Sequence, residues 1–230
     1  FLNDTGDPMD DNGHGTHVAG TIGATGNNGI GIAGVSWDVQ IMALKFLGAN
    51  GSGSGSDAIR ALEYAVANGA TISNNSYGGD PFSQIFLDAI TAARDAGHLF
   101  VAAAGNGNIF GIGVNNDVTP FYPSGYDSNN VLAVAAVNHN DVLARFSNFG
   151  PTTVDVAAPG VDILSTQPGG GYQLLSGTSM ATPHVAGLAA LVWDANPSWT
   201  YDQVIQQIVN TVDLLPDLAG QIVTGGRINA

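Results

Sequence analysis

The chain has 230 residues, a length that suits one large domain with enough apolar side chains for a core. Its 19 acidic residues face only 5 Lys and Arg, so the formal net charge is −14 and nucleic acid is a poor partner. The absence of cysteine excludes disulfides and zinc–thiolate sites, and no apolar run approaches the roughly 18 residues of a membrane span.

In the first half of the chain, apolar runs alternate with amphipathic stretches. Residues 40–46 predict a buried strand, and the Gly/Ser-rich residues 51–56 that follow predict a surface loop. Residues 57–68 place apolar side chains at helical spacing, with Ser56 as the expected N-cap. The other predicted elements are a strand at 71–74, a helix at 84–96 and a strand at 99–104. This alternation predicts a three-layer α/β fold with a mainly parallel central sheet and helices on both faces.

The second half is richer in short β-prone segments. Strands are predicted at 131–137, 154–157, 161–165 and 172–175. The Pro/Gly-rich residues 167–171 join the last two strands and predict a hairpin. A buried helix is predicted from Ser179 to about residue 195, because Ala, Gly, Val and Leu dominate it, and an amphipathic helix is predicted at 200–210.

Three segments carry side chains suited to acyl transfer. His-Gly-Thr-His-Val-Ala-Gly at 14–20 offers an imidazole whose pKa near neutrality suits a general base. Gly-Thr-Ser-Met-Ala-Thr-Pro-His at 177–184 places the Ser179 hydroxyl at a helix N-terminus, which stabilises anions. Ala-Gly-Asn-Gly at 104–107 adds the amide of Asn106 as an oxyanion donor. A base, a nucleophile and an oxyanion donor are therefore present in a workable order.

Each motif also has a plainer interpretation when it stands alone. The histidine motif could be a two-histidine metal pair or two core histidines, and the serine and asparagine motifs could be ordinary loops and turns. Long matches in the right order make chance a negligible explanation. His17 and His184 lie one helical turn beyond the reactive positions and are interpreted as structural, whereas His98 and His139 lie in polar turns and are expected to be solvated.

These three segments resemble the motifs of the subtilisin-like serine proteases, and the similarity covers nearly the whole chain. The resemblance implies a single subtilisin-like peptidase domain over residues 1–230, acting as a serine endopeptidase through an acyl-enzyme. By this match Ser179 is the nucleophile, His14 the general base and Asn106 the oxyanion donor, with Thr178 supporting the oxyanion site.

The resemblance also implies a substrate cleft. Asn-Ser-Tyr-Gly-Gly at 75–79 resembles the family's cleft segment, Ala-Ala-Pro-Gly at 157–160 resembles the strand end after it, and residues 51–54 are one plausible wall. The expected substrate-binding residues are Ser76, Tyr77, Gly78, Ala103 and Gly105. Because these residues are small or uncharged, we expect a broad preference for apolar or aromatic P1 side chains.

The aspartate that orients the histidine in this family is not where the resemblance places it, about 32 residues before the base. Only 13 residues precede His14, and Asp4-Thr5-Gly6 has the wrong spacing and no room for a strand before it. We therefore expect Asp4 not to be the acid, and the domain to be incomplete at both ends and weakly active or inactive. The alternative is a non-catalytic peptide-binding or structural module.

The resemblance implies no catalytic cofactor, and structural calcium is the metal it suggests. Residues 25–30 resemble a variant of a calcium-binding loop. Asp7, Asp10 and Asp11 could form a second oxygen-rich site, although a solvated acidic loop is the preferred interpretation. The parent protein is expected to be a secreted monomer, made with a prodomain, that acts on peptides or proteins without a nucleic-acid or membrane partner.

Overall fold

Eight strands are described in a computed structural model that covers residues 1–79 and 81–230. Their bounds are β1 Ile72–Asn75, β2 Leu99–Ala103, β3 Val131–Val137, β4 Val156–Pro159, β5 Ile163–Thr166, β6 Tyr172–Leu175, β7 Asp213–Leu214 and β8 Gly226–Arg227. The central sheet has the order β1-β2-β3-β4-β8-β7, and only β7 runs antiparallel to its neighbour. The mainly parallel sheet predicted from the sequence is therefore confirmed.

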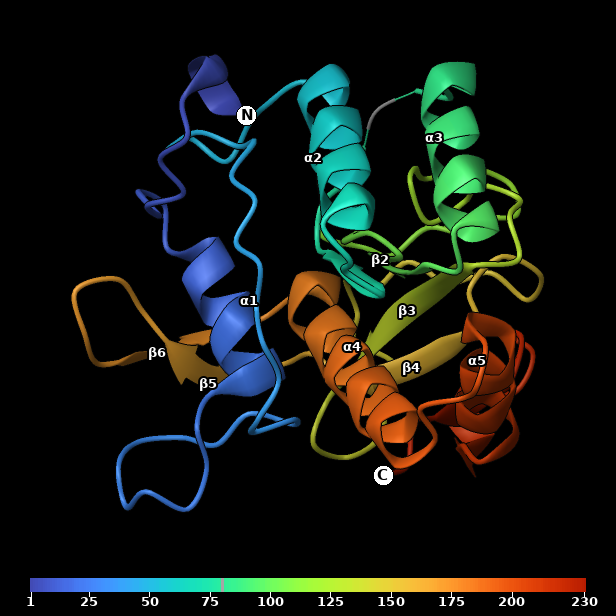
Figure 1. Cartoon of the computed structure of the whole chain (residues 1–230). Helices are drawn as coiled ribbons and strands as arrows, with labels where there is room; N and C mark the ends of the chain where they lie inside the picture. Colours follow the sequence, from blue (N-terminus) through green and yellow to red (C-terminus); the bar gives the residue numbers. More distant parts are fainter. Residues whose placement is uncertain (80) are drawn as a thin grey trace.

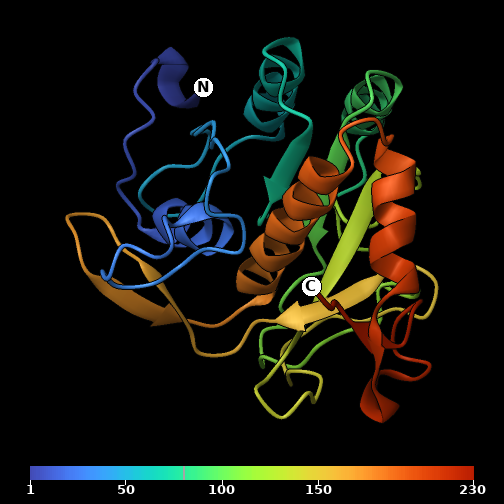
Figure 2. The same cartoon turned by 60° about the horizontal axis from the view of Figure 1, so that its bottom comes forward.

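Helices cover both faces of this sheet. Their bounds are α1 His14–Gly23, α2 Gly55–Ala67, α3 Gln84–Asp95, α4 Thr178–Ala195 and α5 Tyr201–Asn210. Helices α2 and α3 lie on one face and α4 and α5 on the other, as Figure 1 shows. The predicted hairpin forms from β5 and β6, and it lies beside α1, apart from the central sheet (Figure 2).

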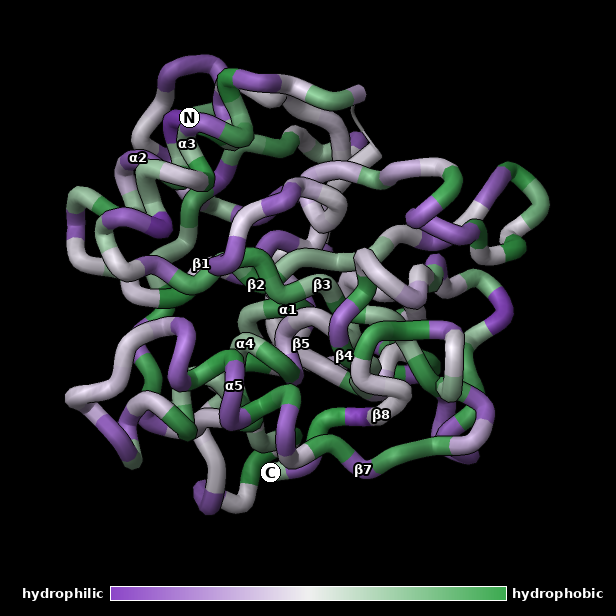
Figure 3. Tube along the Cα trace, turned by 90° about the vertical axis from the view of Figure 1, so that its right-hand side faces the viewer, coloured by the Kyte–Doolittle hydropathy of each residue, from purple (hydrophilic) through white to green (hydrophobic). Residues whose placement is uncertain are grey.

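The buried strand β2 shows how the three layers are joined. Phe100 and Ala102 pack against α2 and α3, whereas Leu99 and Val101 face α4 and α5. Because both faces of the strand are covered, its sequence is continuously apolar and does not alternate. Figure 3 shows the resulting concentration of hydrophobic chain around β2 and β3. Among the described residues, none of the helices combines the length and hydropathy that a membrane crossing requires.

Side-chain caps fix where the helices begin. Helix α2 starts two residues before the predicted position, because the hydroxyl of Ser54, and not that of Ser56, accepts the N–H of Asp57 at 3.1 Å. Ser83 caps α3 in the same way, as its place before the helix suggested. Thr200 caps α5 within a capping box, which fixes the predicted start of that helix.

The prediction of a strand at residues 40–46 is wrong. These residues form an extended loop in which Ile41 and Met42 are 45% and 40% exposed. Within the described residues, the segment's only backbone hydrogen bonds are those that the Lys45 carbonyl accepts from Phe1 and Leu2. A strand needs a hydrogen-bonded neighbour, and the apolar pattern of this segment has none to pair with.

His98 is buried rather than solvated, so that prediction is also wrong. Its ring is 1% exposed and contacts the Ala70 carbonyl through Nδ1 at 2.8 Å, because the turn between α3 and β2 folds back onto the chain before β1. Burial lowers the pKa of His98. His139 is exposed, as predicted, and His184 binds the Met180 carbonyl one helical turn away, as a structural residue does.

Asp155 provides a test of the sheet's electrostatics. It lies just before β4, where its carboxylate accepts the Ala133 N–H at 2.7 Å, and burial raises its pKa from 3.8 to about 6. The folded protein thus binds this proton more tightly than the unfolded chain, so stability falls as the pH rises from about 4 to about 6. We expect Asp155→Asn to increase the free energy of unfolding by about 1–2 kcal/mol near pH 7.5 and to have little effect near pH 4. Urea unfolding at both pH values measures this, and an equal gain at both would contradict it.

Candidate active site

His14 begins α1, and the turn before it is held by Asp10. The Asp10 carboxylate accepts the N–H groups of Asn12, Gly13 and Thr16 at 2.8–2.9 Å and the Thr16 hydroxyl at 2.6 Å. Burial opposes ionisation here, but these hydrogen bonds hold the pKa of the Asp10 carboxyl well below its ordinary value. A negative charge therefore stays at the N-terminus of α1, where the helix dipole favours it.

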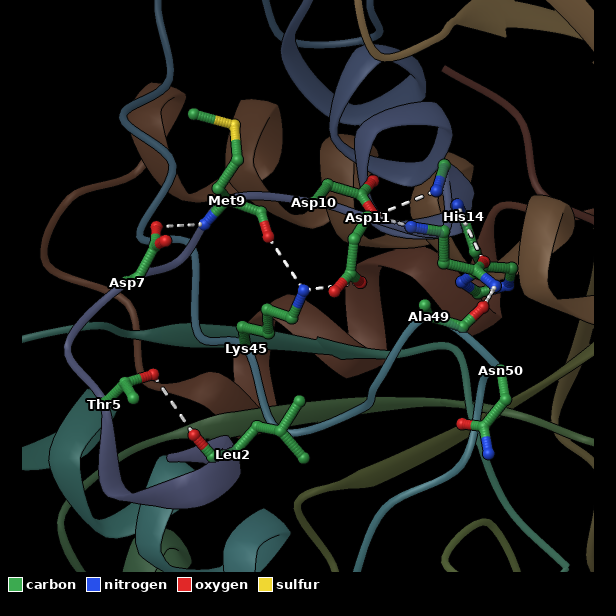
Figure 4. A network of polar contacts seen from close by, with 12 residues as sticks. Leu2, Thr5, Asp7, Met9, Asp10, Asp11, His14, Lys45, Ala49 and Asn50 are labelled. Carbon is green, nitrogen blue, oxygen red and sulfur yellow. Dashed lines mark hydrogen bonds and ion pairs between the residues drawn. The ribbon is translucent and has the colours of Figure 1, made fainter.

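The other acidic residues of this loop have different partners (Figure 4). Asp11 forms an ion pair with Lys45 at 2.5 Å, and the Lys45 ammonium also donates to the Met9 carbonyl at 2.8 Å. Asp7 accepts the Met9 N–H at 2.9 Å. The carboxylates considered as a metal site thus do not converge, and the described part of the chain contains no group of three His or acidic side chains that could hold a metal ion.

The environment of His14 suits a general base. Burial and the neighbouring His17 lower the pKa of His14, and Asp10 opposes them only partly. The imidazole is therefore mainly neutral near pH 7, which is the form that accepts a proton. His17 is fully buried, and its Nε2 lies 2.9 Å from the Ile163 carbonyl and 3.2 Å from that of Gln173. It thereby attaches α1 to the β5–β6 hairpin, which is a structural role.

Ser179 lies in the first turn of α4, four residues before Pro183. Proline has no N–H, so the Ser179 carbonyl lacks the partner that an ordinary helix would give it. Ser76, just after β1, supplies one: its hydroxyl donates to this carbonyl at 2.8 Å, and the Ser179 hydroxyl donates to the Ser76 carbonyl at 3.2 Å. Two hydrogen bonds between the same two residues therefore hold the nucleophile's turn against the sheet.

This arrangement predicts that Ser76 and Pro183 are energetically coupled. Ser76→Ala leaves the Ser179 carbonyl without a donor and is expected to cost about 1–3 kcal/mol of unfolding free energy. In the Pro183→Ala background the new N–H at residue 183 can serve that carbonyl, so the same substitution is expected to cost clearly less. Urea unfolding of the four proteins in this cycle measures the coupling. An equal loss of unfolding free energy on Ser76→Ala in both backgrounds would show that the Ser76 hydroxyl does not serve the Ser179 carbonyl.

Asn106 follows β2, and Thr178 orients its amide. The Asn106 Oδ1 accepts the Thr178 N–H at 2.8 Å and the Thr178 hydroxyl at 3.0 Å. A Cβ atom on Gly177 would lie 3.5 Å from the Asn106 Nδ2 and 3.6 Å from the Ser179 backbone nitrogen. Two N–H donors therefore border one small space beside Ser179, which is the arrangement that a developing oxyanion needs. Thr178 supports this site by fixing the amide, because its own side chain is fully buried.

The ends of β1 and β2 bring the predicted cleft residues together. Gly78 and Gly105 both face Phe121: a Cβ atom would come within 2.5 Å of its ring at residue 78 and 3.1 Å at residue 105. Phe121 therefore packs on two of the predicted cleft residues, a contact that the sequence analysis missed, since a single aromatic side chain in a loop carries no spacing signal. Ser76 and Ala103 are buried beside this cleft.

Tyr77 also has a structural role beside the predicted one. Its hydroxyl donates to the Asn75 side chain at 3.0 Å, and its ring packs edge-to-face on Phe46, with the ring centroids 4.7 Å apart. Burial raises the pKa of the Tyr77 hydroxyl. The side chain thus supports the end of β1 from within the α2–α3 layer.

Among the described residues, no carboxylate is bonded to the His14 ring. Within residues 1–79 and 81–230 the structure assigns no hydrogen bond or ion pair to that imidazole. Asp4 instead pairs with Arg60 at 2.7 Å, with 79% of its side chain exposed, in agreement with the expectation that it is not the orienting acid.

A groove runs along the free edge of β1. Its volume is about 2000 Å³, and its walls include β1, α2, residues 35–48 and the α1 turn that carries Asp10 and His14. Strand β1 has β2 as its one neighbour in the sheet, so its other edge faces this groove. The Asn74 Oδ1 atom is buried here and has no hydrogen-bond partner among the described residues. The groove therefore combines an unpaired strand edge with the candidate base.

Comparisons with known proteins agree with this geometry. Residues 2–225 match the Subtilase family, Peptidase_S8. The chain is 45% identical to the thermophilic serine proteinase of Bacillus sp. (strain AK1), over 100% of this chain and 54% of that protein. It is 45% identical to subtilisin Savinase of Lederbergia lenta, over 90% of this chain and 72% of that protein.

A solved structure matches as well. The crystal structure of a cold-adapted subtilisin-like serine proteinase superposes with a TM-score of 0.82 and 34% identity, covering 99% of this chain and 76% of the other. The chain spans about half the length of the first of these relatives and three quarters of the solved structure. Motif order, sheet topology and site geometry all lead to one assignment: the chain belongs to the subtilase family.

Proposed function

We propose that this chain forms the catalytic part of a serine endopeptidase. The observation that carries the proposal is the convergence of the Asn106 side-chain amide and the Ser179 backbone N–H beside the Ser179 hydroxyl. An amide held by both donors of Thr178 is preorganised, so it loses little when negative charge develops next to it. The relatives named as serine proteinases support the same reaction class.

His14, Ser179 and Asn106 each have a separate part in the proposed reaction. His14 takes the proton of the Ser179 hydroxyl as that oxygen bonds to the substrate carbonyl carbon, and the carbonyl electron pair moves to oxygen. Asn106 and the Ser179 N–H bind the resulting oxyanion. His14 then gives its proton to the leaving amine when the C–N bond breaks, and water repeats the cycle to release the acyl group. The Ser179 hydroxyl must first turn from the Ser76 carbonyl toward His14.

We further propose that the carboxylate that orients His14 is supplied by an extended segment paired to the free edge of β1. The groove is lined by His14 and by the unpaired Asn74 side chain, so an added parallel strand would end near the base. The carboxyl ends of parallel strands meet at one edge of a sheet, and the active-site residues follow the carboxyl ends of β1 and β2.

The substrate is proposed to be an extended peptide or protein segment bound in the cleft between the ends of β1 and β2. The Phe121 ring packs directly on Gly78 and Gly105, so it is the apolar surface that these residues offer to a substrate side chain. A broad preference for apolar or aromatic P1 side chains is the specificity that this lining supports.

Structural calcium finds little support in the residues expected to bind it. The loop at 25–30 contains no carboxylate, and the Asn28 side-chain oxygen already accepts the Ile30 N–H at 3.0 Å. A hard cation prefers several oxygen ligands, usually with acidic residues among them. These residues do not fit a calcium site, and no step of the mechanism involves one. Secretion, a prodomain and a monomeric state remain proposals that rest on the family; several of the relatives are named alkaline proteases.

The test is the intact mass of the 230-residue chain after incubation with a fluorophosphonate probe. We expect one added label, which is lost in Ser179→Ala and kept in Ser52→Ala, an exposed serine in the Gly/Ser-rich loop. No label in a sample with folded circular dichroism would show that this chain alone is unreactive. The alternative, a non-catalytic peptide-binding or structural module, would be favoured if an aspartate-bearing strand paired to β1 also failed to restore labelling.

A further inference from the structure

Two buried asparagines lie beneath the turn that carries Asn106. Asn116 and Asn148 are 2% and 1% exposed, and the Asn148 Nδ2 donates to the Asn116 Oδ1 at 2.9 Å. Neither residue touches the space beside Ser179 at which the oxyanion donors converge. Buried amides are retained where their hydrogen bonds are satisfied, so the partners of this pair indicate its role.

Those partners are the backbone groups on both sides of Asn106. Asn148 Oδ1 accepts the Gly107 N–H at 2.8 Å, and the Asn116 Nδ2 donates to the Ala104 carbonyl at 2.8 Å. The Asn148 backbone N–H also donates to the Gly105 carbonyl at 2.9 Å. The pair therefore holds the turn immediately before and immediately after the oxyanion donor.

Packing fixes the first part of this turn, because Ala104 and Gly105 are buried, but the chain after Gly107 is exposed. Beyond Gly107 the loop continues to a tip at which Ile109 and Phe110 are 94% and 73% exposed. Gly105 and Gly107 adopt φ values of +108° and +77°, so the turn has glycine's freedom on both sides of Asn106. At the base of a solvent-exposed loop, hydrogen bonds to the backbone add to packing in holding one geometry of this turn.

An amide pair is chemically suited to this task. Asn148 accepts two backbone N–H groups, of Gly107 and of Val114 at 3.1 Å, while its NH2 group donates to Asn116. Asn116 in turn donates to a carbonyl. A carboxylate could not donate, and a hydroxyl could not span these groups, so each asparagine uses both ends of its amide.

We propose that Asn148 and Asn116 are positioning residues that hold the Asn106 amide in its oxyanion-binding orientation. They act through the backbone of residues 104–107 and touch no substrate. This inference rests on the proposed function, because the effect on chemistry requires that Ser179 reacts as described.

The experiment compares Asn148→Ala with Asn130→Ala. Asn130 is also fully buried and bonded to backbone carbonyls, those of Ile90 and His98, but it lies before β3, at the opposite end of the sheet from the site. We expect Asn148→Ala to slow labelling of Ser179 by a fluorophosphonate about tenfold or more, as loss of part of an oxyanion site does. Asn130→Ala is expected to lower the Tm comparably and to change the rate less than twofold.

A double-variant cycle separates positioning from general destabilisation. If Asn148 acts through Asn106, then Asn148→Ala adds little once Asn106→Leu has removed the donor. An unchanged rate in Asn148→Ala, or the same fold-loss in both backgrounds, would overturn the proposal. If Asn148→Ala does not fold, Asn116→Ala replaces it in the cycle. This variant leaves in place the two hydrogen bonds that Asn148 Oδ1 accepts from backbone N–H groups.

Amide hydrogen exchange distinguishes failure of this inference from failure of the proposed function. We expect the Gly107 N–H to exchange faster in Asn148→Ala than in Asn130→Ala, whether or not the chain reacts with the probe. If the unmodified chain takes no label, the proposed function fails and exchange alone decides whether the pair holds the turn. Equal exchange in the two variants would overturn the positioning role.

Discussion

A peptide that pairs with the free edge of β1 and ends in aspartate is expected to raise the rate at which Ser179 reacts with a fluorophosphonate by about 10³- to 10⁴-fold. In subtilisin, a member of the same family, loss of the orienting aspartate costs about 3 × 10⁴ in kcat, or roughly 6 kcal/mol of barrier. The described residues place no carboxylate on the His14 ring. We therefore expect an added carboxylate to recover most of this rate factor.

The groove determines the design of this peptide. A strand buried on both faces should be continuously apolar, and a parallel orientation to β1 brings the side-chain carboxylate of its last residue toward Asp10 and His14. The side chain of Asn74, whose buried oxygen lacks a partner, offers a hydrogen-bond position along this edge. Labelling rates measured across a peptide titration give both the affinity of the peptide for the groove and its effect on the reaction of Ser179.

The matched control is the same peptide with asparagine in place of the terminal aspartate. With the C-terminus amidated in both peptides, it fills the groove equally but has no carboxylate at this end to stabilise an imidazolium, so we expect binding with little acceleration. Equal acceleration by both peptides would show that the groove contributes only packing. No binding by either would show that this edge does not accept a strand.

Gly177→Ala is expected to slow labelling of Ser179 by about 10²- to 10³-fold while leaving stability nearly unchanged. The added methyl group would lie 3.5 Å from the Asn106 Nδ2 and 3.6 Å from the Ser179 nitrogen, at ordinary contact distances. The φ of residue 177 is 161°, an extended value that alanine adopts without strain. The methyl group therefore fits the fold but occupies the space that the oxyanion needs.

Two further variants complete this test. Asn106→Leu removes one donor and is expected to reduce the rate by a similar factor, as loss of the corresponding amide does in subtilisin. Gly97→Ala, at a turn where a methyl group meets nothing within 4 Å, is a control for glycine substitution, although its φ of +85° costs some stability. A labelling rate near that of the unmodified chain in Gly177→Ala would place the oxyanion site elsewhere.

The sequence by itself determined the elements whose signals are local. Apolar runs of strand length between turn residues located β2, β3 and β6, and an amphipathic stretch at residues 84–96 located α3. The three candidate active-site residues were also readable, because His14, Asn106 and Ser179 each lie within a contiguous motif. Local hydrogen-bond and packing patterns repeat at fixed spacing, so one sequence carries them.

The tertiary structure decided whatever depends on a neighbour distant in the chain. Residues 40–46 have the composition of a strand but no strand beside them, and His98 has a polar setting in sequence but lies against the carbonyl of Ala70. Phe121 packs on Gly78 and Gly105 only because β1 and β2 end next to it. Burial and pairing are properties of contacts, and the pattern of one segment does not state which segment it will meet.

The same reason explains the supports of the active site. Ser76 donates to the carbonyl that Pro183 leaves free, 103 residues along the chain, and Asn148 binds the turn of Asn106 from 41 residues away. Proline's missing N–H and an asparagine in a loop are visible in the sequence, but their partners are not. The motifs show which candidate side chains lie at the starts of helices. The hydrogen bonds that orient these side chains form only when the chain folds, because each bond joins residues that are far apart in the sequence.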